Sequence, residues 1–164
     1  MVKENSSNKM RNTKSIFLII VAFICFSCSH KTELKSDQLN DKSERIDILS
    51  DEVKLFSEIQ NAEFDLFNVN GFSDDFLVFP GASSTYYKFV VKLNQNDIEK
   101  WREGLIETKG NIENEQWIFD LIKTRQNEWV INSKPKFYTR NGEYGVKIII
   151  FEKEGIVFKS INQQ

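Results

Sequence analysis

The residues with the strongest nucleophilic and metal-binding chemistry lie close together near the start of the chain. Cys25, Cys28 and His30 are its only cysteines and its only histidine. Cysteine nucleophiles, Ser-His-Asp triads and zinc sites built from His or Cys each need at least one such residue. A domain formed by the later residues therefore lacks these three chemistries, and its remaining acid–base groups are carboxylates, lysines and tyrosines.

An apolar stretch leads up to Cys28. The leader 1–14 carries four basic residues and one acidic residue, and residues 15–29 are uncharged. A helix that crosses a bilayer permanently needs about 20 predominantly apolar residues, so this stretch is short for a membrane span. It fits the hydrophobic region of a cleavable export signal. Ser27 supplies a small residue immediately before Cys28.

Residues 1–28 resemble a bacterial lipoprotein signal, in which a small residue precedes the cysteine that becomes the new amino terminus. Cys25 and Phe26 depart from the usual pattern, which has Leu and a small residue at those positions. The resemblance implies cleavage between Ser27 and Cys28, a diacylglycerol thioether on Cys28 and an N-acyl chain. Two or more acyl chains give stable anchoring, so the protein would be held on the exported side of the outer or cytoplasmic membrane of a bacterial cell envelope. The alternatives are an ordinary signal peptide with an incidental cysteine and an uncleaved anchor helix.

Cleavage would change the chemical inventory. Loss of residues 1–27 leaves 18 basic and 23 acidic residues, so the formal net charge goes from −2 to −5. An acidic protein whose lysines are spread along the chain has no electrostatic basis for binding phosphate backbones, and nucleic acid is not an expected partner. The exported domain would also hold no disulfide and no free thiol, so its apolar core alone must stabilise it.

The chain divides into three expected segments. Residues 1–27 are the signal peptide, and residues 28–42 are the lipidated cysteine with a solvated polar tether, in which Leu34 and Leu39 are the only strong hydrophobic residues. The alternative is that Leu34 and Leu39 begin the next helix. Residues 43–164 form a single domain that is long enough to build its own core.

Hydrophobic spacing predicts the elements of that domain. Apolar residues at intervals of three and four predict a helix over 43–60, although Ser50 followed by two acids could start a separate shorter helix. Further helices are predicted over 94–105 and 113–123. Alternation and β-branched runs predict strands over 63–69, 76–79, 85–93, 136–140, 144–152 and 156–160.

The order of these elements predicts an α+β domain: an antiparallel sheet of about five or six strands with two or three helices packed on one face. Residues 153–155 connect the last two strands so tightly that these must form an antiparallel hairpin. The run Ile148–Phe151 is apolar on both faces, which predicts a central strand covered by the helices.

Three aromatic residues are candidates for a partner-binding surface. Trp129 lies beside Glu128 in an expected loop, and Tyr86 and Tyr87 are adjacent in one strand, so one of the two must point away from a core on a single face. Exposed aromatic rings often seat a partner. The competing interpretation is that these rings belong to the core.

Other motifs give weaker signals. Residues 68–75 loosely resemble a calcium loop but lack the terminal Glu, and residues 81–85 could bind an anion with backbone amides; ordinary turns explain both. A carboxylate pair could serve a glycosidase, although nothing in the sequence brings two acids together. The candidate acids are Asp74, Asp75, Glu113, Glu115 and Glu143. The sequence thus indicates no catalytic residue, metal site or cofactor.

Three functions remain as hypotheses. The first is a small, lipid-anchored, non-catalytic domain that binds another protein or a cell-envelope ligand. The second is a membrane-tethered immunity or inhibitor protein whose acidic surface covers the basic site of a toxin, since complementary charge speeds docking. The third is an envelope hydrolase that uses carboxylates.

Overall fold

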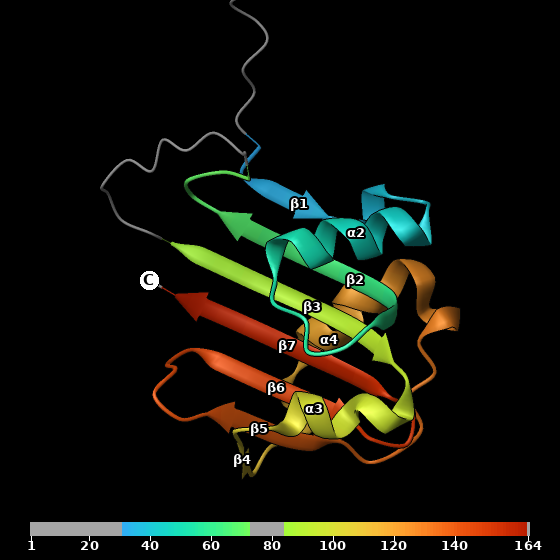
Figure 1. Ribbon diagram of the computed structural model, residues 1–164, viewed down its shortest axis with the longest axis vertical. Helices are drawn as coiled ribbons and strands as arrows, with labels where there is room; N and C mark the ends of the chain where they lie inside the picture. The colour runs from blue at the N-terminus through green and yellow to red at the C-terminus, as the bar shows by residue number, and fades with distance from the viewer. Residues whose placement is uncertain (1–30, 73–83, 164) are drawn as a thin grey trace, which may run out of the picture. The chain divides into compact units, whose positions relative to one another are not determined.

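A computed structural model describes residues 31–72 and 84–163, and the folded unit begins at Thr32. Within these residues a seven-stranded sheet has the order β1-β2-β3-β7-β6-β5-β4, and every neighbouring pair is antiparallel (Figure 1). The strands are β1 (Glu33–Lys35), β2 (Ile59–Asn68), β3 (Thr85–Leu93), β4 (Leu105–Thr108), β5 (Lys136–Arg140), β6 (Val146–Phe151) and β7 (Ile156–Gln163).

Short helices connect and cover these strands. The α-helices are α2 (Lys42–Glu52), α3 (Ile98–Arg102) and α4 (Gln116–Ile122), and the 3-10 helices are η1 (Ser36–Gln38), η2 (Gln95–Asp97), η3 (Ile112–Asn114) and η4 (Lys123–Glu128). The α+β class and the antiparallel sheet are confirmed. The described residues form seven strands rather than five or six. The short edge strands β1 and β4 were not predicted, because neither contains a long run of apolar residues.

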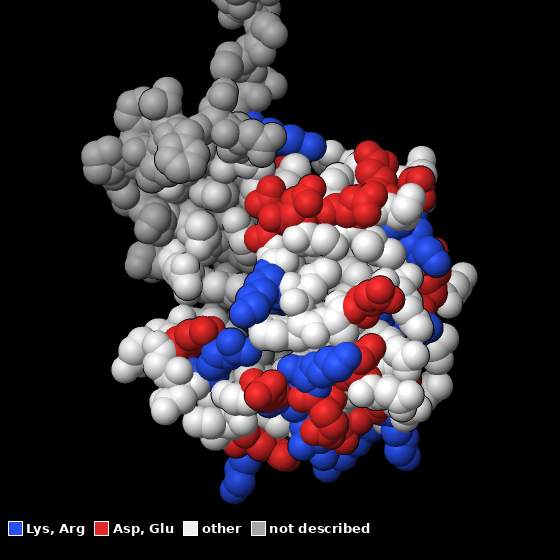
Figure 2. Space-filling model, in the orientation of Figure 1, with Lys and Arg blue, Asp and Glu red and all other residues white. Residues whose placement is uncertain are grey.

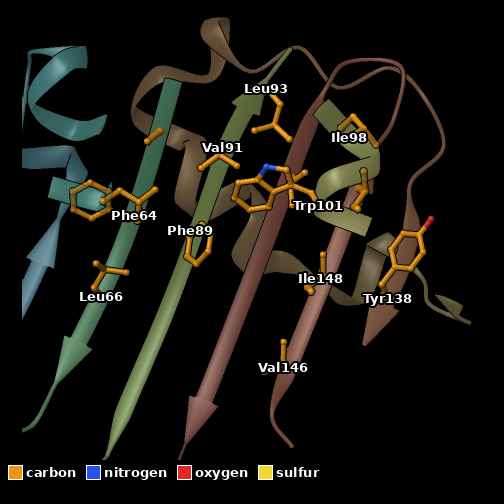
Figure 3. Close-up of a cluster of buried hydrophobic side chains, with 14 of the residues drawn as sticks. Phe64, Leu66, Phe89, Val91, Leu93, Ile98, Trp101, Tyr138, Val146 and Ile148 are labelled. Atoms are coloured by element: carbon orange, nitrogen blue, oxygen red, sulfur yellow. The ribbon is translucent and has the colours of Figure 1, made fainter. Parts of the chain in front are cut away.

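Each face of the sheet carries a buried core cluster. On β3, Phe89 and Val91 point into one core cluster with α2 and α3, whereas Val90 points into a second cluster with α4. Figure 3 shows Ile98 and Trp101 of α3 pointing toward the strands in the first cluster, with Trp101 beside Val91.

The prediction that the helices pack on one face is therefore not confirmed. Figure 1 shows α2 and α3 in front of the sheet and α4 behind it. The physical reason is the run Ile148–Phe151, which is buried throughout and alternates between the two clusters. A strand that is apolar on both faces needs cover on both.

The predicted helix over 43–60 ends early. α2 starts after Asp41, whose side chain accepts a hydrogen bond from Ser43 N at 2.9 Å, and it ends at Glu52. Phe56 instead packs edge-on against the Trp101 ring at 5.3 Å. Ile59 begins β2, because pairing with β3 outweighs the helical spacing of the apolar residues.

The expected tether over 28–42 is also too long. Glu33–Lys35 pairs with β2, and Leu34 and Ser36 are buried. Leu34 lies in the strand β1 rather than at the start of a helix, and the folded unit begins at Thr32.

Several local predictions are confirmed. β3 and β5 have the predicted bounds, and β6 and β7 form the predicted hairpin. The helix predicted over 94–105 ends at Arg102, because Gly104 has a φ of 71° and turns the chain so that Leu105 starts β4. The strand predicted over 76–79 lies outside the described residues.

Candidate functional site

The helix α4 covers only part of its face of the sheet. Along β3, Val90 is buried beneath α4, whereas Lys88 and Tyr86, which point to the same side, are only partly buried. On this face β7 and β6 change from apolar to polar at the same level, from Phe158 to Ser160 and from Ile149 to Lys147. We call the uncovered half the open sheet face; its residues are Glu33, Lys35, Asp65, Phe67, Tyr86, Lys88, Lys147, Ser160 and Asn162.

A row of charges crosses this face from strand to strand. The register places Lys35 opposite Asp65, and Asp65 opposite Lys88. Lys88 in turn lies opposite Ser160, which lies opposite Lys147. Side chains directly opposite each other in an antiparallel pair are within reach of one another, so these groups form one continuous surface.

The two outer lysines of the row have acidic partners. Lys35 Nζ lies 3.2 Å from Glu33 Oε2 and 3.9 Å from Asp65 Oδ1. The hydrogen bond with Glu33, followed by the charge of Asp65, raises the pKa of Lys35 above its ordinary value. Lys147 Nζ lies 2.6 Å from Glu115 Oε1.

Lys88, at the centre of the row, is held by aromatic rings instead. Its Nζ lies 4.6 Å from the centroid of the Tyr86 ring and 5.9 Å from that of Trp117. Asp65 faces Lys88 in register but its salt bridge is with Lys35. Within the described part of the chain, Lys88 has no carboxylate within salt-bridge distance, so its ammonium is available to an outside anion.

Trp117 forms a fixed aromatic wall beside Lys88. Its Nε1 donates to Glu115 Oε2 at 2.7 Å, and its ring packs edge-on against Phe158 at 6.0 Å. Glu115 precedes α4 and Phe158 lies in β7, so the Trp117 ring is already held in place by the protein. It loses little conformational freedom when a ligand packs against it.

A cavity of about 220 Å³ lies between this wall and the start of η1. Its charged lining is balanced, with Lys35, Lys88 and Lys123 against Asp37, Asp65 and Asp120. Pockets for drug-sized ligands are typically about 300–1,000 Å³, so this cavity suits one side chain or one small polar group of a larger partner.

The structure separates the three predicted surface aromatics. Tyr86 belongs to the open sheet face, whereas Tyr87 lies on the opposite face, 6.1 Å from the Phe72 ring, where burial raises its pKa. Trp129 is only 2% exposed and belongs to the α4 core cluster, so the prediction that it is partly exposed is wrong. The polar neighbour Glu128 suggested exposure, but Trp129 caps the end of η4 and packs with the apolar residues of α4.

Sequence reasoning missed Lys88 and Trp117 as a pair. The available signal was the alternation of Tyr86, Lys88 and Val90, which marks where the cover of a strand begins. Nothing local indicates that Trp117, which comes later in the chain, lies against Lys88.

The candidate acids are not brought together as a catalytic pair. Glu115 is bound to Lys147 and Trp117, Glu113 contacts Asn111, and Glu143 lies near Arg140. Asp74 and Asp75 lie outside the described residues, as do residues 73–75 of the calcium-like loop and residues 81–83 of the anion-binding candidate. In 31–72 and 84–163, no group of three or more His, Cys, Asp or Glu could hold a metal ion.

A second charged cluster is buried at the edge of β2, where β1 stops. Arg45 and Glu63 are each 1% exposed, and Arg125 Nη1 donates to Glu63 Oε2 at 2.8 Å. Ser36 Oγ donates to the same Glu63 oxygen at 2.6 Å. Because α2, η1, β2 and η4 all contribute a group, this cluster has a structural role.

The chain folds as a small α+β domain with a partly covered, charged sheet face. No protein-family model, curated protein or solved structure matches the chain. The helices of the described segments include none that is long and apolar enough to span a membrane.

Proposed function

We propose that this protein is a lipid-anchored, non-catalytic binding domain of the bacterial cell envelope, and that its open sheet face binds an acidic group of a protein or envelope ligand. The observation that carries this proposal is Lys88, a lysine held between Tyr86 and Trp117 with no acidic partner among the described residues. A bound carboxylate or phosphate would supply that partner, and the two rings would contribute contact area.

The anchor is supported by the sequence. The basic leader, the uncharged stretch 15–29 and Ser27 before Cys28 are the parts of a lipoprotein signal. Mass spectrometry of the mature amino terminus tests it: an acylated Cys28 is expected, and an intact Met1 would contradict the anchor.

A binding role fits the surface better than catalysis does. Acids at the open sheet face are already engaged by lysines: Asp65 and Glu33 by Lys35, and Glu115 by Lys147. A general base needs a free or activated carboxylate in reach of its substrate. The hydrolase hypothesis therefore gains nothing from the described residues.

Site-directed photocrosslinking tests the binding surface. A benzophenone amino acid replaces Tyr86 in the full-length protein, which is expressed in its own host and irradiated on intact cells. We expect a discrete adduct that is lost when Lys88→Met is added and kept when the exposed Lys153→Met is added. An adduct that still forms in the Lys88→Met variant, or the absence of any discrete adduct, would refute the role of this surface.

The immunity or inhibitor hypothesis has one observation in its favour. Figure 2 shows acidic side chains gathered over α2, on the face opposite the open sheet face, and Glu44, Asp47 and Asp51 are exposed there. If this hypothesis is right, a co-encoded toxin is neutralised by the wild type but not by Asp47→Lys with Asp51→Lys. Lys88→Met would leave that neutralisation intact, which separates the two functions.

A further inference from the structure

One end of the sheet gathers the start of the folded unit and several strand ends. β1 begins there and β2 ends there, with Asn68 N donating to Thr32 O at 3.0 Å. β3 begins and β7 ends at the same end, since Thr85 pairs with Gln163. The β5–β6 turn, 141–145, lies there too, because Asn162 N donates to Gly145 O at 3.0 Å. We call this the anchor end; it is toward the left in Figure 1.

Very little chain separates this end from the proposed lipid. Only residues 29–31 lie between Cys28 and Thr32. A fully extended chain spans at most about 3.6 Å per residue, so Thr32 lies within about 14 Å of the acylated residue. A strand of ten residues such as β2 is about 33 Å long, which puts the opposite end of the sheet beyond that reach.

Two of the five exposed large apolar side chains among the described residues lie at the anchor end. Tyr144, in the β5–β6 turn, is 93% exposed, and Val69, just after β2, is 43% exposed. Tyrosine is enriched at the interface between membrane and water, where its ring sits among the headgroups and its hydroxyl stays hydrated. Arg140 and Glu143, which both precede Tyr144 in the chain, lie 3.9 Å apart and offset each other's charge, so contact there depends little on lipid charge.

We propose that the anchor end rests on the membrane surface, with Val69 and Tyr144 at the headgroups. This proposal rests on the lipid anchor of the proposed function. It also places the open sheet face close to the bilayer: Lys88 follows Thr85 by three residues along β3, or about 10 Å. A partner bound at Lys88 would therefore lie at the membrane surface.

Single-cysteine labelling tests the proposal, because the chain has no cysteine after Cys28. Full-length protein carrying Val69→Cys, Tyr144→Cys or Val130→Cys is labelled with the fluorophore NBD and reconstituted in phosphatidylcholine vesicles. Val130, 56% exposed, is the control, because it precedes Asn132, whose backbone N–H bonds to Glu154 in the β6–β7 turn at the opposite end. Lipids with a spin label near the headgroup serve as quenchers.

We expect blue-shifted emission and quenching by the labelled lipids at positions 69 and 144, and neither at 130. A label at 144 that behaves like the one at 130 would overturn the proposal. The proposal would also be overturned if the emission shift at 144 increased with the protein-to-lipid ratio and the labelled lipids did not quench it. That result would indicate that Tyr144 contacts a second copy of the protein.

Mass spectrometry of the same samples distinguishes failure of the lipid anchor from failure of the proposed membrane orientation. An acylated Cys28 with a solvent-exposed label at 144 would leave the anchor standing and refute the orientation. An unmodified amino terminus would refute both. Neither result depends on the photocrosslinking at Tyr86, which tests the binding surface by itself.

Discussion

Arg45 Nε and Glu63 Oε1 lie 3.5 Å apart in the interior, and both side chains are almost completely buried. Arg45 Nε donates its hydrogen bond to Ala62 O, so it contacts Glu63 Oε1 mainly through charge. Arg125 completes the group as a second cation on the same carboxylate. A buried cation and a partly buried cation on one buried anion make the fold sensitive to the loss of that anion.

Removing the carboxylate should therefore be costly. Glu63→Ala leaves Arg45 and Arg125 without their shared counterion, and loss of one partner from a buried ion pair typically costs about 3–5 kcal/mol. Glu128→Ala is the control, because Glu128 contacts Arg45 but is 46% exposed, so we expect a loss of about 1 kcal/mol or less. Urea unfolding monitored by tryptophan fluorescence measures both. Equal losses for the two variants would contradict the structural role of Glu63.

Two glycines offer a matched test of backbone packing. Gly142 and Gly145 both have a φ of 77°, but a Cβ on Gly142 meets no atom within 4 Å, whereas one on Gly145 falls 2.1 Å from Asn162 O. Gly142→Ala should cost about 1–2 kcal/mol, the penalty for a left-handed residue with a side chain. Gly145→Ala should cost clearly more, because the backbone of β7 must move. Thermal unfolding compares them, and similar midpoints would contradict the close approach.

Lys159 should be a stability liability at neutral pH. Burial, followed by the nearby charge of Arg140, lowers the pKa of Lys159 below its ordinary value of 10.5. Between the two values the unfolded chain binds more protons than the folded one, so stability rises with pH in that window. Lys159→Met should therefore stabilise the protein at pH 7 by on the order of 1 kcal/mol. Lys153→Met, at an exposed position, should change little, and a destabilised Lys159→Met variant would contradict the argument.

Glu154 should make stability rise with pH in the acid range. Burial acts to raise the pKa of Glu154, but hydrogen bonds from Ser133 and from the Asn132 backbone outweigh it and lower the pKa below 4.5. The ionised form is then favoured by folding, so its contribution is present above about pH 4.5 and is lost as the pH falls through the folded value.

The pH dependence of urea midpoints checks this assignment. Glu154→Gln should lower the midpoint at pH 7, by on the order of 1 kcal/mol in free energy, and should flatten the loss of stability below about pH 4.5. Ser133→Ala should do the same to a smaller extent, because the two backbone donors remain. If Glu154→Gln lost stability below about pH 4.5 as steeply as the wild type does, other carboxylates would be responsible for that loss.

Residue alternation and short connections in the sequence predicted two strands and one hairpin correctly. β3 and β5 have their predicted bounds because both are rich in residues that favour strands. The connection between β6 and β7, 152–155, is so short that these strands can only form a hairpin. The end of α2 could not be predicted in this way. Phe56 continues the helical spacing, but its contact is with Trp101, which comes 45 residues later.

The sequence by itself determined the chemical inventory: an apolar leader that ends at Cys28, and no cysteine or histidine after His30. It also determined which residues share a strand face, because alternation is a local property. The tertiary structure alone decided that Trp129 is buried, that Glu63 meets Arg45 and Arg125, and that Lys88 lies between Tyr86 and Trp117. These outcomes depend on which helix covers which part of the sheet, and that is set by packing between residues far apart in the chain.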